Sequence, residues 1–193
     1  MVWRWPSEGL LEQTEQATYY EQVSNNTPWR DLAGSAYWRT RVEDTSSGSR
    51  KPATVVLTLD FHAPERGLAM TMAIRRDASE DAAITHLLEF MFSDRQGAPI
   101  DAIAEVTNVV MKQLDGSSTK ALAGRSIKVA PGLFLFGLSA EKDDARRNAE
   151  SLRVLSRMDI PFRFANGSTA IISVNKGASG ERAFSEALAD WAR

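Results

Sequence analysis

The stretch VVLTLDFHAPERGLAMTMAIRR, residues 55–76, decides the fold of this chain, because two runs of alternating apolar residues flank a short polar connection. Successive side chains of a β-strand point to opposite faces, so a period of two places one apolar set inward. The inward sets are Val55, Leu57, Leu59 and Phe61 in the first run, and Leu68, Met70, Met72 and Ile74 in the second. The short connection predicts two antiparallel strands, each with one face in water.

The alternation continues on both sides of this stretch. Before it, SAYWRTRV (residues 35–42) and ATYYEQV (residues 17–23) predict two more strands, and the polar residues 44–52 predict a loop. After it, the apolar runs 84–92 and 103–113 favour strands. Two further strands are predicted on either side of Pro131 and Gly132, within residues 126–139. The chain therefore begins as an antiparallel meander.

The last third of the chain changes to a helical period. Residues 140–158 predict a helix with acidic residues first, and with Arg153 and Arg157 at the end where the helix dipole favours a cation. Residues 161–174 predict a hairpin that turns at Asn166 and Gly167, since both tolerate the positive φ of a tight turn.

The closing helix follows within residues 176–193, and Ser179 is its predicted N-cap. Its apolar stripe consists of Phe184, Ala187, Leu188 and Trp191. We expect this stripe to dock on the domain itself, because so short a helix is marginal in water alone. The order of elements predicts an α+β fold of mainly antiparallel β-structure, as a sandwich or a curved sheet, with two helices near the C-terminus. Residues 1–16 are predicted to form an N-terminal arm and residues 17–193 a single β-rich domain.

The composition excludes several function classes. The chain has 193 residues, a net charge of -2 and no cysteine. A charge this small gives no general attraction to nucleic acid or to anionic lipid, and the missing cysteines exclude disulfides and sulfur-bound zinc. No run approaches the ~20 apolar residues that cross a bilayer, and the N-terminus has no signal-peptide pattern. We therefore expect no cofactor and no metal.

One short motif and one residue pair fit catalysis by their spacing. Residues 117–120 (SSTK) have the S-x-x-K spacing of serine acyl-enzymes, in which a helical turn brings Lys120 to Ser117. The companion motifs of that class are missing, so chance explains the match better. Asp60 and His62 share a strand face as an acid and base, although a surface pair explains them better. His86 lies on an apolar face and is expected to be a hydrogen-bonded core residue.

Candidate binding residues are of two kinds. The arginines Arg39 and Arg41 on one strand, and the doublet Arg75 and Arg76 on another, are suited to an anionic group, as is the doublet Arg146 and Arg147. Acidic neighbours favour a solvated, ion-paired face for both doublets. Trp3 and Trp5 in the arm are residue types that are enriched at protein interfaces. A pocket lined by Met70, Met72, Phe134 and Phe136 would suit a ligand carrier, although core packing explains these residues better.

A resemblance to a known family is carried by six collinear segments: GLAMTMAIRRD, ITHLLEFMF, VVMKQ, LAGRSIKVAPGLFLFGLS, DARRNAESLRVLSRMDIPF and NKGASGERAFSEALADW. Through these segments, residues 34–191 resemble an uncharacterised alphaproteobacterial family. Members of that family carry this region as a C-terminal domain after a membrane anchor and a linker. The resemblance implies an extracytoplasmic domain with no assigned activity.

A fainter similarity is to the invasion-associated locus B proteins, which are exported and β-rich. Gly180, Phe184 and Ala187 carry it at the closing segment. It is a similarity of architecture, since those proteins have a cysteine pair.

These observations predict a non-enzymatic binding or protein-interaction module of the bacterial cell envelope, whose partner is another envelope protein. The alternatives are a small serine-type hydrolase and a small-ligand carrier. The expected compartment is periplasmic or extracytoplasmic if an anchor precedes Met1, and cytoplasmic otherwise.

Overall fold

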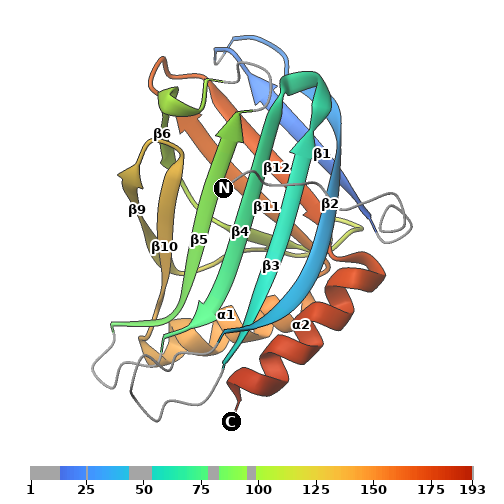
Figure 1. Ribbon diagram of the computed structural model, residues 1–193, viewed down its shortest axis with the longest axis vertical. Coiled ribbons are helices and arrows are strands. Elements are labelled where there is room, and N and C mark those ends of the chain that lie inside the picture. Colours follow the sequence, from blue (N-terminus) through green and yellow to red (C-terminus); the bar gives the residue numbers. More distant parts are fainter. Residues whose placement is uncertain (1–13, 25, 44–53, 78–82, 95–98, 193) are drawn as a thin grey trace.

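The computed structural model describes residues 14–24, 26–43, 54–77, 83–94 and 99–192, which form one curved antiparallel sheet and two helices (Figure 1). The strands are β1 (Glu15–Gln22), β2 (Arg30–Glu43), β3 (Thr54–Ala63), β4 (Leu68–Arg76), β5 (Ile84–Asp94), β6 (Ile103–Val106), β7 (Val110–Lys112), β8 (Thr119–Ala121), β9 (Gly124–Ala130), β10 (Leu133–Ser139), β11 (Arg157–Phe164) and β12 (Thr169–Asn175). The helices are α1 (Lys142–Val154) and α2 (Gly177–Trp191). The predicted α+β fold class is confirmed, in its curved-sheet form.

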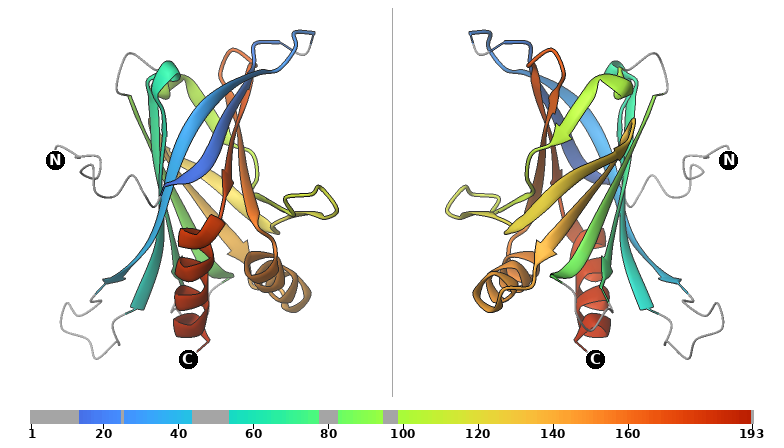
Figure 2. Two further views of the ribbon diagram at one scale, coloured as in Figure 1. Left: turned by 90° about the vertical axis from the view of Figure 1, so that its right-hand side faces the viewer. Right: turned by 90° about the vertical axis from the view of Figure 1, so that its left-hand side faces the viewer.

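The sheet joins the two halves of the chain through its first strand. The strand order is β8-β7-β11-β12-β1-β2-β3-β4-β5-β10-β9, and β6 pairs with β11 beside this path. Because β1 pairs with β12 on one side and β2 on the other, the C-terminal hairpin continues the N-terminal meander. Figure 2 shows the strands curling into a half-barrel, with both helices at one end. The predicted functional residues within the described part of the chain are therefore placed relative to one sheet.

Two segments depart from the predicted elements for local reasons. Residues 103–113 form two short strands separated by residues 107–109, where the side chain of Asn108 accepts a hydrogen bond from the Val109 N–H at 2.7 Å. The predicted helix of residues 140–158 ends at Val154, and Arg157 and Met158 belong to β11. Met158 lies opposite both Val174 and Met111 and is fully buried, so strand pairing outweighs the helical period there.

Strands β1 and β2 begin before the positions that the sequence predicts. β1 starts at Glu15, two residues inside the predicted arm, and β2 starts at Arg30. The remainder of the arm, including Trp3 and Trp5, and the loop 44–52 lie outside the described residues.

The predicted hairpin turn is confirmed at residues 164–168. The Phe164 N–H donates to the Ser168 carbonyl and the Gly167 N–H donates to the Phe164 carbonyl, which closes a three-residue loop. Only Gly167 has a positive φ, at 86°, whereas Asn166 uses its side-chain oxygen to accept from the Ser168 N–H.

The core fills the inside of the half-barrel. The inward residues predicted from the alternation of residues 55–76 are all buried there, together with apolar residues of β5, β10, β11 and β12. Met70, Met72, Phe134 and Phe136, which the carrier hypothesis places around a pocket, are at most 2% exposed and pack in this core. They are packing residues, as is usual for large apolar side chains at strand spacing.

The prediction of a wet outer face is wrong for β3. Val56, Thr58 and Asp60 on that face are at most 2% exposed. Long side chains from the flanking strands cover them: Arg75 of β4 reaches Glu43 of β2 at 3.6 Å, across the position of Val56. The aliphatic stem of an arginine can cover apolar surface while its charged end stays in water. The outer face of β3 can therefore be buried although the alternation of its sequence predicts exposure.

Helix α2 packs across the inner face of β2 and β3. The Phe184 ring lies edge-on to the Trp38 ring with centroids 5.1 Å apart, and the Trp191 indole N–H donates to the Val55 carbonyl at 2.8 Å. Phe184, Ala187 and Trp191 are buried. The expectation that the closing helix docks on its own domain is confirmed.

The N-terminus of α2 is capped from another strand, so the prediction of Ser179 as N-cap is wrong. The helix begins at Gly177, and Ser179 lies in its first turn. The Glu15 carboxylate of β1 accepts a hydrogen bond from the Ser179 N–H at 2.8 Å. A carboxylate at this end of a helix satisfies a free N–H and opposes the positive end of the dipole.

Lys176 ties the two helices together. Its Nζ donates to the Leu152 carbonyl in the last turn of α1 at 2.6 Å and lies 4.2 Å from the centre of the Phe184 ring. Lys176 is fully buried, and this burial lowers its pKa to about 8. The last turn of α1 contains the predicted Arg153, whereas Arg157 belongs to β11. Lys176 is a further cation at this end of the helix.

Candidate functional site

The serine–lysine motif does not have the geometry of an acyl-enzyme. Ser117 lies in the turn between β7 and β8, where its N–H bonds to the Asp115 carboxylate at 2.8 Å, and Lys120 lies on β8. No helical turn joins the two residues, and both are on the surface or near it. The arrangement therefore lacks the base beside the hydroxyl that this chemistry requires.

Asp60 is buried in a structural network on the outer face of the sheet. Arg39 Nε and Nη2 donate to its Oδ2 at 3.1 and 2.9 Å, and Thr71 Oγ1 donates to its Oδ1 at 3.0 Å. Both carboxylate oxygens are thus held by neighbouring strands. Asp60 is 1% exposed. The expectation that Asp60 and His62 form a pair on the surface is therefore wrong for Asp60.

The structure divides the candidate arginines between the two faces. Arg39, Arg41 and Arg75 lie on the outer face, where Arg41 and Arg75 both pair with Glu43 and Arg39 pairs with Asp60. Arg76 points to the inner side, opposite His86 of β5. The doublet of Arg75 and Arg76 cannot hold one anion together, because neighbouring strand residues face opposite ways.

The second doublet is a pair of exposed ion pairs on α1. Arg146 pairs with Asp143 and Arg147 pairs with Asp144, each three positions away along the helix. This agrees with the solvated face that the acidic neighbours predict.

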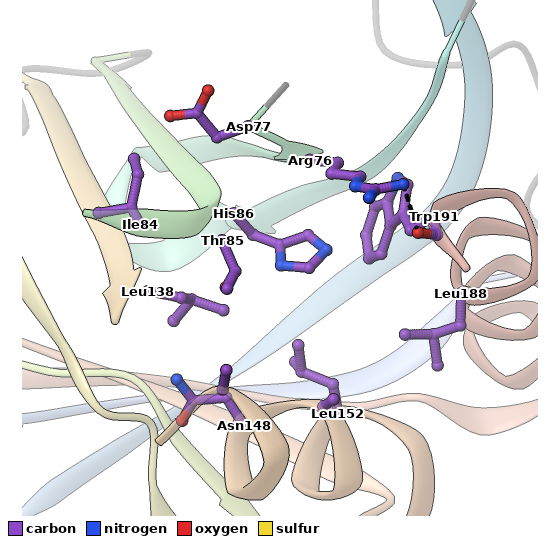
Figure 3. A pocket seen from close by; sticks show the side chains of 12 residues that line it. Arg76, Asp77, Ile84, Thr85, His86, Leu138, Asn148, Leu152, Leu188 and Trp191 are labelled. Carbon is purple, nitrogen blue, oxygen red and sulfur yellow. Dashed lines mark hydrogen bonds between the residues drawn. The ribbon is translucent and has the colours of Figure 1, made fainter. Parts of the chain in front are cut away.

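A cleft opens where the helices meet the end of the half-barrel. Its volume is about 370 Å³, and its walls come from the ends of β4, β5 and β10 and from both helices. Ile84, Leu138, Leu152, Leu188 and Trp191 give it an apolar lining, and Arg76, Asp77, Thr85, His86 and Asn148 supply its polar groups. Figure 3 shows these side chains surrounding the His86 ring. A concave, mostly apolar site with a few polar groups is the usual form of a small-ligand site.

Asn148 fixes the α1 wall of this cleft. Its side-chain amide accepts from the Ala123 N–H and donates to the Ala123 carbonyl, both at 2.8 Å. It is 3% exposed and shares its helix face with Ala145 and Leu152. The wall is therefore bonded to the segment before β9 as well as packed on the core.

His86 has the most unusual environment of the polar groups in the cleft. Its ring lies against the Trp191 ring with centroids 4.7 Å apart, and its Nε2 is buried with no hydrogen-bond partner among the described residues. Burial, and then the nearby Arg76 charge, lower the pKa of His86 to about 4. The expected hydrogen bond of a core histidine is missing at Nε2, which is buried without a partner among the described residues, while the ring packs on Trp191.

Arg76 connects the rim of the cleft to the end of α2. Its Nη1 donates to the Trp191 carbonyl at 2.7 Å, where the helix dipole favours a cation. The side chain is exposed, so its remaining donors are accessible at the mouth of the cleft. Figure 3 shows the Asp77 carboxylate pointing away from the His86 ring.

The described residues contain no cluster of side chains that could hold a metal ion and no helix that could cross a membrane. No cluster of three or more His, Asp or Glu side chains is placed to hold a metal ion in this part of the chain. Among the same residues, no helix is both long and apolar enough to cross a bilayer.

Comparison with protein-family models, curated proteins and solved structures gives no match to this chain. We therefore infer function from the geometry of the cleft.

Proposed function

We propose that this chain is a non-enzymatic binding module of the bacterial cell envelope that holds a small amphipathic molecule in the cleft between α1, α2 and the ends of β4 and β5. The observation that supports this best is the cleft of about 370 Å³, in which apolar walls from both helices and from the ends of β5 and β10 lie beside the polar residues Arg76, Asp77 and Thr85. A concave site with apolar walls and a few polar groups is the usual form of a small-ligand site.

The proposed location in the envelope rests on the resemblance of residues 34–191 to the alphaproteobacterial family. An anchored, extracytoplasmic module would present the cleft to small molecules of the periplasm. Fractionation of cells that express the natural gene tests this location, and recovery of the protein in the cytosol contradicts it.

A screen of small amphipathic molecules by thermal unfolding tests the binding function. A ligand at one hundred times its Kd stabilises the folded state by about 2.7 kcal/mol, which for a chain of this size raises Tm by roughly 5–10 °C. The variant Ala145→Phe fills the cleft from α1 and is expected to abolish this rise.

The matched control for that screen is Ala189→Phe, which adds the same ring at an exposed position of α2 outside the cleft lining. This variant is expected to keep the full ligand-induced rise. Equal rises in both variants would place the binding elsewhere and contradict the proposal.

Association with another envelope protein is a second candidate function, and a separate surface favours it. Met91, Ile127 and Val129 are 52%, 60% and 53% exposed. They lie on the outer face of β5 and β9, on either side of the half-buried Leu133 and Leu135 of β10. We call these five residues the outer apolar patch. Such a gathering of apolar side chains on a soluble domain is typical of an interaction site.

The patch is tested by a charge substitution at its centre. Ile127→Glu is expected to abolish co-purification of one defined partner after cross-linking in envelope membranes, whereas Thr119→Glu on the exposed strand β8 keeps it. A partner recovered equally by both variants would rule out this surface.

A further inference from the structure

A second concave site lies on the outer face of the sheet. Its volume is about 280 Å³, and its polar lining comes from β1, β11 and β12. We call it the outer groove, and its polar residues are Gln16, Thr18, Tyr20, Arg157, Ser173 and Asn175. The cleft between the helices shares none of these residues, so the two sites are separate.

Strand alternation and register bring the polar residues of the outer groove together. Gln16, Thr18 and Tyr20 alternate with the buried core residues of β1 and therefore face outward. Ser173 of β12 lies directly opposite Thr18. Asn175 follows two positions later and faces the same way, so both strands present polar side chains to one place.

The hairpin of β7 and β8 supplies a wall of the groove. Its turn contains Leu114, which is 57% exposed and lines the groove. Figure 2 shows this hairpin, in yellow-green, projecting from the sheet. A wall that rises from the outer face makes a concave site on the convex side of a curled sheet.

A buried network fixes the floor of the groove. Ser173 is 2% exposed, accepts a hydrogen bond from Arg157 Nε at 2.6 Å and donates to the Asp159 carboxylate. The same carboxylate pairs with Lys112 Nζ at 2.6 Å. Arg157 is thereby held in place through Nε, and its Nη atoms have no partner in the described part of the chain.

The remaining polar side chains of the groove also have hydrogen-bonding capacity to spare. Within the described residues, the side chains of Gln16, Thr18, Tyr20 and Asn175 make no hydrogen bond. Each amide and each hydroxyl group both donates and accepts. Such a set matches a ligand whose own groups do the same, and the hydroxyl groups of a sugar have this property.

The charge and size of the groove favour one neutral ring. Arg157 is the charged residue of the lining, and its Nε lies 3.5 Å from the Asp159 carboxylate, which would oppose an anion beside it. Tyr20 and Leu114 offer apolar surface to the C–H groups of a sugar ring. Ligand sites usually begin at about 300 Å³, so a volume of 280 Å³ suits a single ring.

We propose that the outer groove binds one ring of a neutral sugar. The sugar hydroxyl groups bond to the amides of Gln16 and Asn175 and to the Nη atoms of Arg157. The ring packs against Tyr20 and Leu114. This site is additional to the cleft and does not depend on the function proposed for it.

Titration of the purified protein with glucose, galactose, mannose and N-acetylglucosamine, followed by NMR, tests the proposal. At least one sugar is expected to bind with a Kd that is roughly millimolar. The variants Gln16→Ala and Asn175→Ala are each expected to raise this Kd about fivefold, because each removes hydrogen bonds to the ligand. Gln16 is exposed, so its replacement leaves the fold intact. Asn26→Ala removes an exposed amide outside the groove and is the matched control, with an unchanged Kd.

Three outcomes would overturn the proposal. The first is that none of the four sugars binds in the millimolar range. The second is an unchanged Kd in both Gln16→Ala and Asn175→Ala. The third is loss of sugar binding in Ala145→Phe, which fills the cleft between the helices and is expected to leave the outer groove untouched.

Discussion

Replacement of Trp191 by alanine is expected to lower the free energy of unfolding by about 3–5 kcal/mol, the usual cost of removing a large aromatic side chain from a core. Trp191 is 6% exposed, its ring lies against His86, and its indole N–H donates to the Val55 carbonyl. The substitution therefore opens a cavity and leaves the Val55 carbonyl without this donor. Both effects destabilise the folded state.

Urea unfolding of the wild type and of Trp191→Ala, followed by circular dichroism, measures this loss. Ser185→Ala on the exposed face of the same helix is the control and is expected to change stability by less than about 0.5 kcal/mol. A loss below about 1 kcal/mol for Trp191→Ala would mean that α2 contributes little to the core. In that case the helix would be free to serve a partner protein instead.

The sheet could be predicted because its strands alternate strictly. From Val55 to Ile74 every inward strand position is apolar, and the observed register pairs Phe61 with Met70 and Leu57 with Ile74. A shift by one residue would turn these side chains outward, so the core itself selects this register. The closing helix was predictable for the same reason, since Phe184, Ala187 and Trp191 repeat at helical spacing and are buried.

The covering of the outer face could not be read from the alternation. Asp60 and Thr58 are polar and occupy outward positions, so the pattern predicts exposure. They are buried because Arg39 bonds to Asp60 from the next strand and Thr58 donates to the Arg39 carbonyl. Such networks depend on which strands become neighbours, and the periodicity of one segment carries no information on that.

The cap of α2 and the cleft are missed for the same reason. The Glu15 carboxylate accepts a hydrogen bond from the Ser179 N–H, and the two residues are 164 positions apart in the sequence. No local sequence motif could therefore predict this cap. The cleft joins Arg76, His86 and Trp191, which only the fold brings together. One signal was present in the sequence: Asn148 lies three positions after Ala145, within the apolar stripe of α1, where a polar residue needs a specific partner.

Acidification is expected to destabilise the wild type through His86. The pKa of this residue is lowered to about 4 in the folded protein, whereas an unfolded chain has a histidine pKa near 6.5. Between these values the unfolded state binds more protons, so stability is complete above pH 6.5 and is lost as the pH falls toward 4. A difference of about 2.5 pKa units corresponds to about 3 kcal/mol.

The variant His86→Gln isolates this contribution, because glutamine does not titrate. Urea unfolding at pH 7, 6, 5 and 4 is expected to show that the wild type loses about 3 kcal/mol more than His86→Gln over this range. The control variant His62→Gln removes the other histidine of the chain and keeps His86. It is therefore expected to keep the loss of stability on acidification that His86 causes. Parallel pH profiles for the wild type and His86→Gln would show that the imidazole is as easily protonated in the folded protein as in water. That result would contradict the burial of the His86 ring against Trp191 in the wall of the cleft.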